Sequence, residues 1–412
     1  MLPKYFYTIL LGCCMLVNAN AQTVLYETQQ DDGIVTIPFT LVNNLPVVTV
    51  TINGLLPLQF IFDTGAEHNL LIIKELGDAL GLIYEKKVTI YGADLSSEMT
   101  AALARNISLT AGDMTANAQG LLVLDRDYFR FEELTGTQIH GILGASFFHN
   151  FITKIDYPLG RIMLIPREQF KPPNKHFDIL PLKIIRNKPY IQTAVTLAND
   201  TVVQSLLLLL DTGASLSLLL QTNSHPHLQP PKQAIAGNLG IGIGGVLQGF
   251  LGRVKFLQFG KFQIPQVLTN YQSLSNSPLD LEKSVTRNGI IGSLVLSRFV
   301  LYFDYFEQKL YLRARKGFDA PFEYDRSGLL VIAGGEKLQD FIIHDVLPNS
   351  PATMAGIRRG DKIIKLNGRP SRRLTLEKIV RKLQRKAGKK VTLQLLRNNE
   401  ILIKEIVLRD LI

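Results

Sequence analysis

The chain is 412 residues long, which is enough for two or three domains with sizeable hydrophobic cores. Hydrophobic residues make up 46% of the sequence and charged residues 19%, a balance typical of a folded globular protein and not of a disordered or fibrous one. The formal net charge is +10. The only cysteines are Cys13 and Cys14, so no disulfide framework, cysteine metal site or cysteine nucleophile is expected after them.

Residues 1–21 have the pattern of a secretory signal peptide. Lys4 precedes an apolar stretch, and Ala19-Asn20-Ala21 offers a small-residue cleavage site. The stretch is too short for a membrane span, and no later segment qualifies as one. Leu10-Leu11-Gly12-Cys13 suggests a lipoprotein signal as the alternative, but apolar residues follow it instead of a polar tether. We therefore expect an exported protein, periplasmic or extracellular, with lipid anchoring the less favoured interpretation.

A β-rich first unit is predicted over residues 22–170. Asn53-Gly54 favours a two-residue hairpin turn between two strand-like runs. The second of these runs leads into Asp63-Thr64-Gly65-Ala66. An apolar-apolar-Gly triplet ends at Gly144, 81 residues after the aspartate.

The same features return over residues 171–318 at a constant offset of 148 residues. Asp211-Thr212-Gly213-Ala214 repeats the four residues, and Gly292 closes a second apolar-apolar-Gly triplet, again 81 residues after the aspartate. A chance Asp-Thr-Gly-Ala is roughly a one-in-a-hundred event in a chain this long, so two aligned copies indicate a duplicated lobe. Short strands separated by turn signals predict that each lobe is barrel-like.

Residues 323–412 predict a small α+β domain. In Ser350-Pro351-Ala352, Ser is a suitable N-cap and Pro suits the first helical position, while Gly356 follows the helix end. Apolar residues recur at helical spacing between residues 374 and 385, and strand-like runs lie on either side of that stretch.

The positive charge is concentrated in this third segment. Residues 323–412 hold 19 Lys or Arg and 10 Asp or Glu, a net charge of +9. Without Lys4 of the predicted signal peptide the chain also carries +9, so the two lobes together are neutral. A basic domain could bind nucleic acid, lipid headgroups or acidic peptides, but we expect these charges to be scattered over helix and loop surfaces as an ordinary solvated face. Because no aromatic stacking residues accompany them, nucleic acid is not the expected partner.

The paired Asp-Thr-Gly motifs, each at the end of a buried strand and each answered by an apolar-apolar-Gly triplet, resemble those of the aspartic peptidases. Ala66 and Ala214 make the resemblance closer to the retroviral type than to pepsin. It implies a mainly β fold with two pseudo-twofold-related acid-protease barrels, in which Asp63 and Asp211 meet. Since one chain supplies both halves, a monomer is expected.

The chemistry implied by this resemblance needs only the two carboxylates and a water molecule. Two carboxyl groups at close range share one proton, so the ionised group can accept a proton from water while the other hydrogen-bonds the substrate carbonyl. Because Ala66 and Ala214 lack the hydroxyl that would stabilise the charged carboxylates, we predict activity at a less acidic pH than for pepsin. No cofactor and no metal are expected.

Other residues are predicted to support these two aspartates. Thr64 and Thr212 could tie the two loops together, Gly65 and Gly213 let backbone amides approach the carboxylates, and Gly144 and Gly292 pack behind the loops, with Ala66 and Ala214 completing the motifs. A hinged, glycine-bearing hairpin in each lobe is expected to cover the cleft. Its predicted residues are Tyr91 and Gly92 in the first lobe and Gly240 and Gly244 in the second.

The third segment resembles a PDZ domain through Ser350-Pro351-Ala352, Gly360-Asp361 and Asn367-Gly368. This resemblance implies a peptide or a C-terminus as ligand. The peptide would add a strand beside Leu329 and Leu330 and face a helix that begins near Leu376. The carboxylate-binding loop departs from the usual PDZ pattern, and Gly328 lies in its nearest counterpart.

Two functions follow from these patterns. The first is an exported aspartic endopeptidase acting on polypeptides, with a PDZ-like domain that recruits or regulates substrate. The second is an inactive, peptidase-like scaffold that binds extended peptides. Residues 240–245 fit a dinucleotide fingerprint only on paper, because no helix or suitably spaced acid follows them. His225-Pro226-His227 has no paired ligand motif, so a polar loop is favoured over a metal site.

Overall fold

The computed structural model describes residues 26–91, 98–242, 245–273 and 287–412, so the predicted signal peptide lies outside the described residues. Strands account for 50% of the residues and helices for 11%, which confirms the mainly β prediction. No helix in the described ranges is long and apolar enough to cross a membrane.

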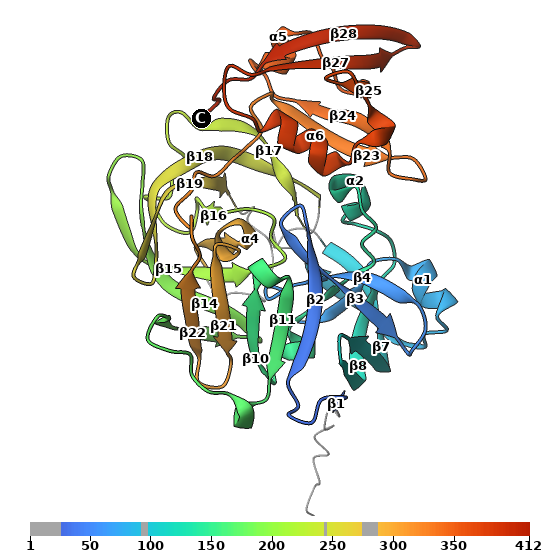
Figure 1. The fold of residues 1–412 in the computed structure, drawn as a ribbon, viewed down its shortest axis with the longest axis vertical. Helices are drawn as coiled ribbons and strands as arrows, with labels where there is room; N and C mark the ends of the chain where they lie inside the picture. The colour runs from blue at the N-terminus through green and yellow to red at the C-terminus, as the bar shows by residue number, and fades with distance from the viewer. Residues whose placement is uncertain (1–25, 92–97, 243–244, 274–286) are drawn as a thin grey trace, which may run out of the picture.

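The first lobe is built mostly from antiparallel strands joined by short turns (Figure 1). Its elements are β1 (Tyr26–Thr28), β2 (Val35–Val42), β3 (Leu45–Ile52), β4 (Pro57–Phe62), β5 (Asn69–Leu71), α1 (Lys74–Ala79), β6 (Tyr84–Tyr91), β7 (Glu98–Ala111), β8 (Met114–Leu124), α2 (Phe131–Thr135), β9 (Gly141–Leu143), α3 (Ala145–Phe148), β10 (Ile152–Asp156), η1 (Tyr157–Leu159), β11 (Arg161–Ile165) and η2 (Arg167–Gln169). Asn53 and Gly54 both have positive φ angles at the turn between β3 and β4, as the sequence predicted.

The second lobe repeats this plan. Its elements are β12 (Asp178–Pro181), β13 (Lys183–Ile185), β14 (Lys188–Thr196), β15 (Val202–Asp211), β16 (Leu218–Gln221), β17 (Ile235–Gly242), β18 (Gly245–Phe259), β19 (Phe262–Gln272), β20 (Gly289–Gly292), α4 (Ser293–Leu296), β21 (Phe299–Asp304) and β22 (Lys309–Ala314). In the first lobe β4 pairs in parallel with β9, and β9 pairs antiparallel with β5. In the second lobe β15, β20 and β16 pair in the same way. The sequence repeat is therefore a repeat of strand pairing.

One sheet joins the two lobes. Its strands follow the order β12-β22-β21-β10-β11-β2, with the first three from lobe two and the rest from lobe one (Figure 1). The joint is the antiparallel pair β10–β21, in which Thr153 lies opposite Phe303 and Ile155 opposite Leu301. A single cluster of buried apolar side chains extends through both lobes. The two lobes therefore share one hydrophobic core and one sheet, and they are not separate domains joined only by a linker.

The C-terminal domain has its own sheet and core. Its elements are β23 (Leu329–Gly334), β24 (Asp340–Val346), α5 (Pro351–Met354), β25 (Lys362–Leu366), β26 (Arg369–Pro370), η4 (Ser371–Arg373), α6 (Leu376–Leu383), β27 (Lys390–Arg397) and β28 (Glu400–Val407). Ser350 caps α5 and Thr375 caps α6 through their side-chain oxygens. Figure 1 shows this domain stacked on the lobes, with α2 of lobe one directly beneath β23.

Candidate active site

Two buried strands deliver the two aspartates to the junction of the lobes. Asp63 follows β4, and Asp211 is the last residue of β15. Phe60, Phe62 and Leu210 anchor these strand ends because their side chains are fully buried in the core. Asp63 is 5% exposed and Asp211 is 9% exposed, so both carboxyl groups are almost completely removed from solvent.

Two threonines lock the aspartate loops to each other. The hydroxyl of Thr212 accepts from the backbone N–H of Thr64 at 3.0 Å and donates to the carbonyl of Phe62 at 2.7 Å. The hydroxyl of Thr64 accepts from the N–H of Thr212 at 3.1 Å and donates to the carbonyl of Leu210 at 2.8 Å. These four reciprocal hydrogen bonds connect lobe one to lobe two, and both threonines are inaccessible to solvent.

Each carboxylate lies between its own loop and the opposite one. The N–H of Gly65 donates to Asp63 Oδ1 at 2.7 Å, and the N–H of Gly213 donates to Asp211 Oδ1 at 2.8 Å. A Cβ atom at Gly65 would lie 2.5 Å from Asp211 Oδ2, and one at Gly213 would lie 2.3 Å from Asp63 Oδ2. Both positions therefore require glycine, since any side chain would collide with the facing carboxylate.

The two carboxyl groups titrate as a pair. Burial raises the pKa of Asp63 well above its usual value, and the neighbouring charge of Asp211 raises it further. Burial also raises the pKa of Asp211, but the hydrogen bond from Asp63 and the positive charge of Arg287 act in the opposite direction. Both carboxyl groups therefore hold a proton more readily than an exposed aspartate, and the pair is suited to sharing one proton.

Gly144 and Gly292 lie directly behind the aspartate loops. A Cβ atom at Gly144 would be 2.4 Å from the carbonyl oxygen of His68 and 3.1 Å from that of Ala66. At Gly292 it would be 2.7 Å from the carbonyl oxygen of Ala214. The N–H of the residue after each glycine donates to the same alanine carbonyl. The two triplets therefore support the loops from equivalent positions.

The predicted flap residues fall on two hairpins. Tyr91 ends β6 and lies opposite Glu98 of β7. Gly240 lies in β17, which pairs antiparallel with β18. Gly92 and Gly244 lie outside the described residues. Closure of these hairpins over the cleft stays a prediction.

Residues that sequence reasoning missed surround the pair. Tyr157 is buried, and Tyr305 is half-buried with its hydroxyl oxygen inaccessible to solvent. Burial raises the pKa of both tyrosines, and the charge of Asp211 raises that of Tyr157 further, as the charge of Asp63 does for Tyr305. Each tyrosine belongs to one lobe, and the aspartate whose charge affects its pKa belongs to the other. The signal was present in the sequence, because Asp156-Tyr157 and Asp304-Tyr305 match at the same 148-residue offset.

In the C-terminal domain, the predicted groove residues lie along β23 and α6. Leu329 and Leu376 are buried in the domain core, and Leu330 is half-buried. Gly328 has a φ angle of +80°, and a Cβ atom there would lie 2.2 Å from Cβ of Ser350, the residue that caps α5. The start of β23 is thus fixed tightly against α5.

The backbone N–H groups at this end of β23 donate hydrogen bonds to a side chain of the same protein, the carboxylate of Asp325. Asp325 Oδ1 accepts from the N–H groups of Ser327, Gly328 and Leu329 at 3.0, 2.6 and 3.1 Å. Burial raises the pKa of Asp325 to about 6, against the lowering effect of these hydrogen bonds. The amides in the nearest counterpart of the carboxylate-binding loop therefore already have an internal acceptor.

The opposite end of the space between β23 and α6 is filled by lobe one. Gly136, which ends α2 in a left-handed conformation, would place a Cβ atom 3.0 Å from Cβ of Leu376 and 3.7 Å from Cβ of Ala333. At the other end, the N–H of Arg326 donates to the carbonyl of Leu383. The two ends of α6 thus contact lobe one and the segment before β23, and local sequence patterns could not reveal either contact.

Two duplicated β lobes that hold a buried pair of aspartates on reciprocally bonded loops define an aspartyl protease-like protein. Comparison with known families agrees with this class. Residues 48–147 match the aspartyl protease family, and residues 342–397 match the PDZ domain family. The chain therefore contains an aspartyl protease-like domain and a PDZ domain, and both resemblances stated from the sequence are confirmed.

Among solved structures, an aspartic proteinase from Irpex lacteus has a TM-score of 0.45 to this chain and is 14% identical. The match covers 70% of this chain and 98% of that one. No curated protein matches the chain by sequence.

Proposed function

We propose that the protein is an aspartic endopeptidase that hydrolyses peptide bonds with a water molecule activated between Asp63 and Asp211. The observation that carries this proposal is the pair of buried carboxyl groups, each packed against the glycine of the opposite loop. Two carboxyl groups that hydrogen-bond to each other in a buried site are suited to sharing one proton.

The proposed reaction uses the two groups in complementary roles. Asp211, ionised, accepts a proton from water while the water oxygen bonds to the scissile carbonyl carbon. Asp63, protonated, donates its proton to the carbonyl oxygen, which gives a neutral tetrahedral intermediate. The C–N bond then breaks as Asp211 passes its proton to the leaving nitrogen and Asp63 recovers a proton from a hydroxyl of the intermediate. No covalent intermediate with the protein forms.

Replacement of either aspartate tests the proposal. Asp63→Asn and Asp211→Asn should each lower the rate of cleavage of an unfolded protein substrate by about a hundredfold or more, since positioned acid–base groups contribute about 10²–10⁴-fold. Asp319→Asn removes an exposed carboxylate and serves as the control. If both dyad variants cleave as well as the unmodified protein, the chain is the peptide-binding scaffold and not an enzyme.

The pH dependence of cleavage offers a second test. The raised pKa of Asp63 keeps the shared proton in place above the range of an ordinary aspartate, which supports the proposed activity at less acidic pH. Cleavage should therefore persist above pH ~4, where an isolated aspartate is ionised. A rate that disappears above that pH would argue against this part of the proposal.

We also propose that the protein is exported as a monomer and that its PDZ domain recruits or regulates polypeptide substrates. The N-terminal pattern supports export, and the continuous core of the two lobes supports a complete site in one chain. N-terminal sequencing of the protein recovered from cells should begin at Gln22. Light scattering of the same material should give the mass of one chain.

A further inference from the structure

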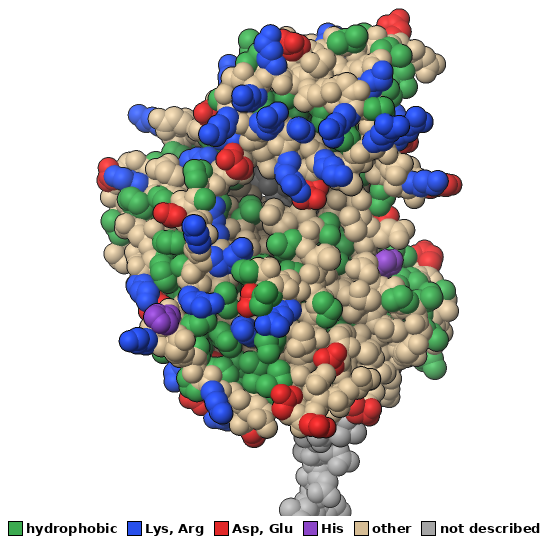
Figure 2. Space-filling view, viewed as in Figure 1, with side chains coloured by type: hydrophobic (Ala, Val, Ile, Leu, Met, Phe, Trp, Pro, Cys, Tyr) green, Lys and Arg blue, Asp and Glu red, His purple; other side chains and the backbone are tan. Residues whose placement is uncertain are grey.

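The surplus positive charge of the protein lies on one surface of the PDZ domain. Residues 369–390 contain ten Lys or Arg and one acidic residue, Glu377, which gives +9, the whole net charge of residues 323–412. All ten side chains are exposed, and Figure 2 shows a row of Lys and Arg side chains across this domain over α6. The ten are Arg369, Arg372, Arg373, Lys378, Arg381, Lys382, Arg385, Lys386, Lys389 and Lys390.

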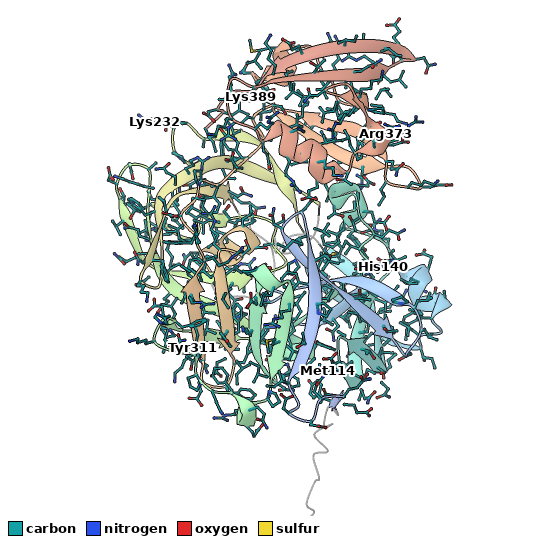
Figure 3. All side chains as sticks on the ribbon, in the orientation of Figure 1. Met114, His140, Lys232, Tyr311, Arg373 and Lys389 are labelled. Atoms are coloured by element: carbon teal, nitrogen blue, oxygen red, sulfur yellow. The ribbon has the colours of Figure 1, made fainter. Side chains whose placement is uncertain are left out.

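These ten residues form the α6 basic surface. In Figure 3, Arg373 and Lys389 lie on either side of α6, so the surface extends past both ends of the helix. The sequence led us to expect scattered charges; in the fold ten of the basic residues belong to the segment around α6, where Figure 2 shows Lys and Arg side chains in a row.

Most of these cations form no ion pair within the residues that the structure describes. Arg381 pairs with Glu377, and Lys390 pairs with Glu405 at 2.9 Å. For the other eight side chains, no carboxylate within the described part of the chain comes within 4 Å. Like charges at this density repel one another, so a surface of this kind is suited to an anionic partner that relieves the repulsion.

The side chains between the charges narrow the class of partner. Residues 369–390 contain no Phe, Tyr, Trp or His, so they offer no platform on which bases could stack. Leu374, Leu376, Ile379 and Leu383 are buried, so no large apolar side chain projects from the surface as in helices that insert into membranes. An acidic polypeptide needs neither feature, only Asp and Glu side chains at the spacing of the cations.

The PDZ groove is a poor alternative for such a partner. Asp325 occupies the amide groups at one end of β23, and Gly136 of lobe one packs on Leu376 at the other. The exposed side of α6 is free of both obstructions. We propose that the α6 basic surface docks acidic polypeptide segments, and that these segments belong to the substrates of the two lobes. The second half of this proposal rests on the proposed peptidase function.

Binding to the full-length protein tests the docking surface without reference to catalysis. The probe is a fluorescein-labelled 15-residue peptide of Asp and Glu, followed by anisotropy. The variant Lys378→Gln/Lys382→Gln/Arg385→Gln/Lys386→Gln should raise the Kd about tenfold or more, and raising the salt from about 50 to 300 mM should have a similar effect on the unmodified protein. The control removes four exposed cations from the lobes: Lys86→Gln/Lys87→Gln/Lys171→Gln/Lys175→Gln.

The outcomes separate the two proposals. Weaker binding in the α6 variant alone supports the docking surface, whereas equal binding by both variants overturns it. Tighter binding of a single-stranded 15-mer of DNA, or of phosphatidylglycerol vesicles, than of the acidic peptide would also overturn it in favour of another anion. Charge-dependent binding of the peptide by a protein that cleaves nothing would leave the docking surface standing and refute the peptidase function alone.

A cleavage assay tests the link to substrates. A peptide with an acidic tail should be cleaved with a kcat/KM at least about five times higher than the same peptide with a Ser/Gly tail, through a lower KM. In the α6 variant this advantage should vanish while cleavage of the Ser/Gly-tailed peptide stays unchanged. An advantage that survives in the variant would show that acidic substrates are selected elsewhere.

Discussion

At the scale of single residues, the hydroxyl groups of Thr64 and Thr212 carry the connection between the two aspartate loops. Thr64→Val keeps the size of the side chain but leaves the N–H of Thr212 and the carbonyl of Leu210 without partners. Each unsatisfied buried group costs about 1–3 kcal/mol, so with two such groups the free energy of unfolding should fall by about 2–6 kcal/mol. Chemical denaturation measures this loss, and Thr64→Ser, which keeps the hydroxyl, should recover most of it.

The carboxyl pair predicts how stability depends on pH. Because the pKa of Asp63 is raised in the folded protein, this residue contributes a stabilisation that is fully present below the unfolded pKa of ~3.9 and is lost as pH rises through the folded pKa. The amide that replaces this carboxyl group in Asp63→Asn cannot ionise. The difference in melting temperature, variant minus unmodified protein, should therefore increase as the pH is raised from about 4 to 8. Parallel pH profiles for the two proteins would contradict the assignment.

Some residues of the candidate site could be predicted from the sequence, and others could not. Asp63 and Asp211 were predictable because the motif, its strand and its spacing all repeat. The part played by Asp325 was not, because three backbone N–H groups converge on its carboxylate only once the loop before β23 has its final shape. Tyr157 and Tyr305 lay in the repeat, but only the folded structure brings each of them under the influence of the opposite aspartate.

At the scale of secondary-structure elements, the contact of α2 with the PDZ domain decides whether the domain is held in place. Gly136→Val adds a side chain where Cβ itself would already lie 3.0 Å from Leu376, at a φ angle of +67°. Overpacking of this kind costs about 1–3 kcal/mol, so amide hydrogen exchange in α2 and β23 should accelerate by about tenfold.

Gly54→Val is the matched control for this contact. Gly54 has a φ angle of +70°, so a valine there meets the same backbone strain, but no atom lies within 4 Å of its Cβ position. Exchange in β23 should be unchanged in this variant. Faster exchange in both variants would mean that the α2 contact does not hold the domain.

Most elements were predictable, whereas their long-range partners were not. The hairpin at Asn53-Gly54 and the capped helix after Ser350 follow from local chemistry, and both are present. The pairing of β10 with β21 joins residues about 150 positions apart, and the residues of one strand do not identify the other as its partner. The helix α2 is only five residues long, which is too short for a periodic apolar pattern to predict it.

At the scale of the whole molecule, the two separate cores predict two unfolding transitions. One apolar cluster extends through both lobes, and another is confined to the PDZ domain. Leu301→Ala should lower the transition of the lobes alone, and Leu393→Ala that of the PDZ domain alone, since each removes a fully buried side chain worth about 2–5 kcal/mol. Differential scanning calorimetry distinguishes the two. A single transition shifted by both variants would show that the domains unfold as one unit.

The joint between β10 and β21 also bears on how the protein is made. When β10 has been translated, the strand that completes its edge is still about 150 residues further along the chain. At about 5–20 residues per second this interval lasts roughly 8–30 seconds. Throughout it the nascent chain presents an unpaired strand edge, and neighbouring chains on the same messenger present identical ones. Pairing between such edges is therefore the step at which chains made close together would be expected to misassemble.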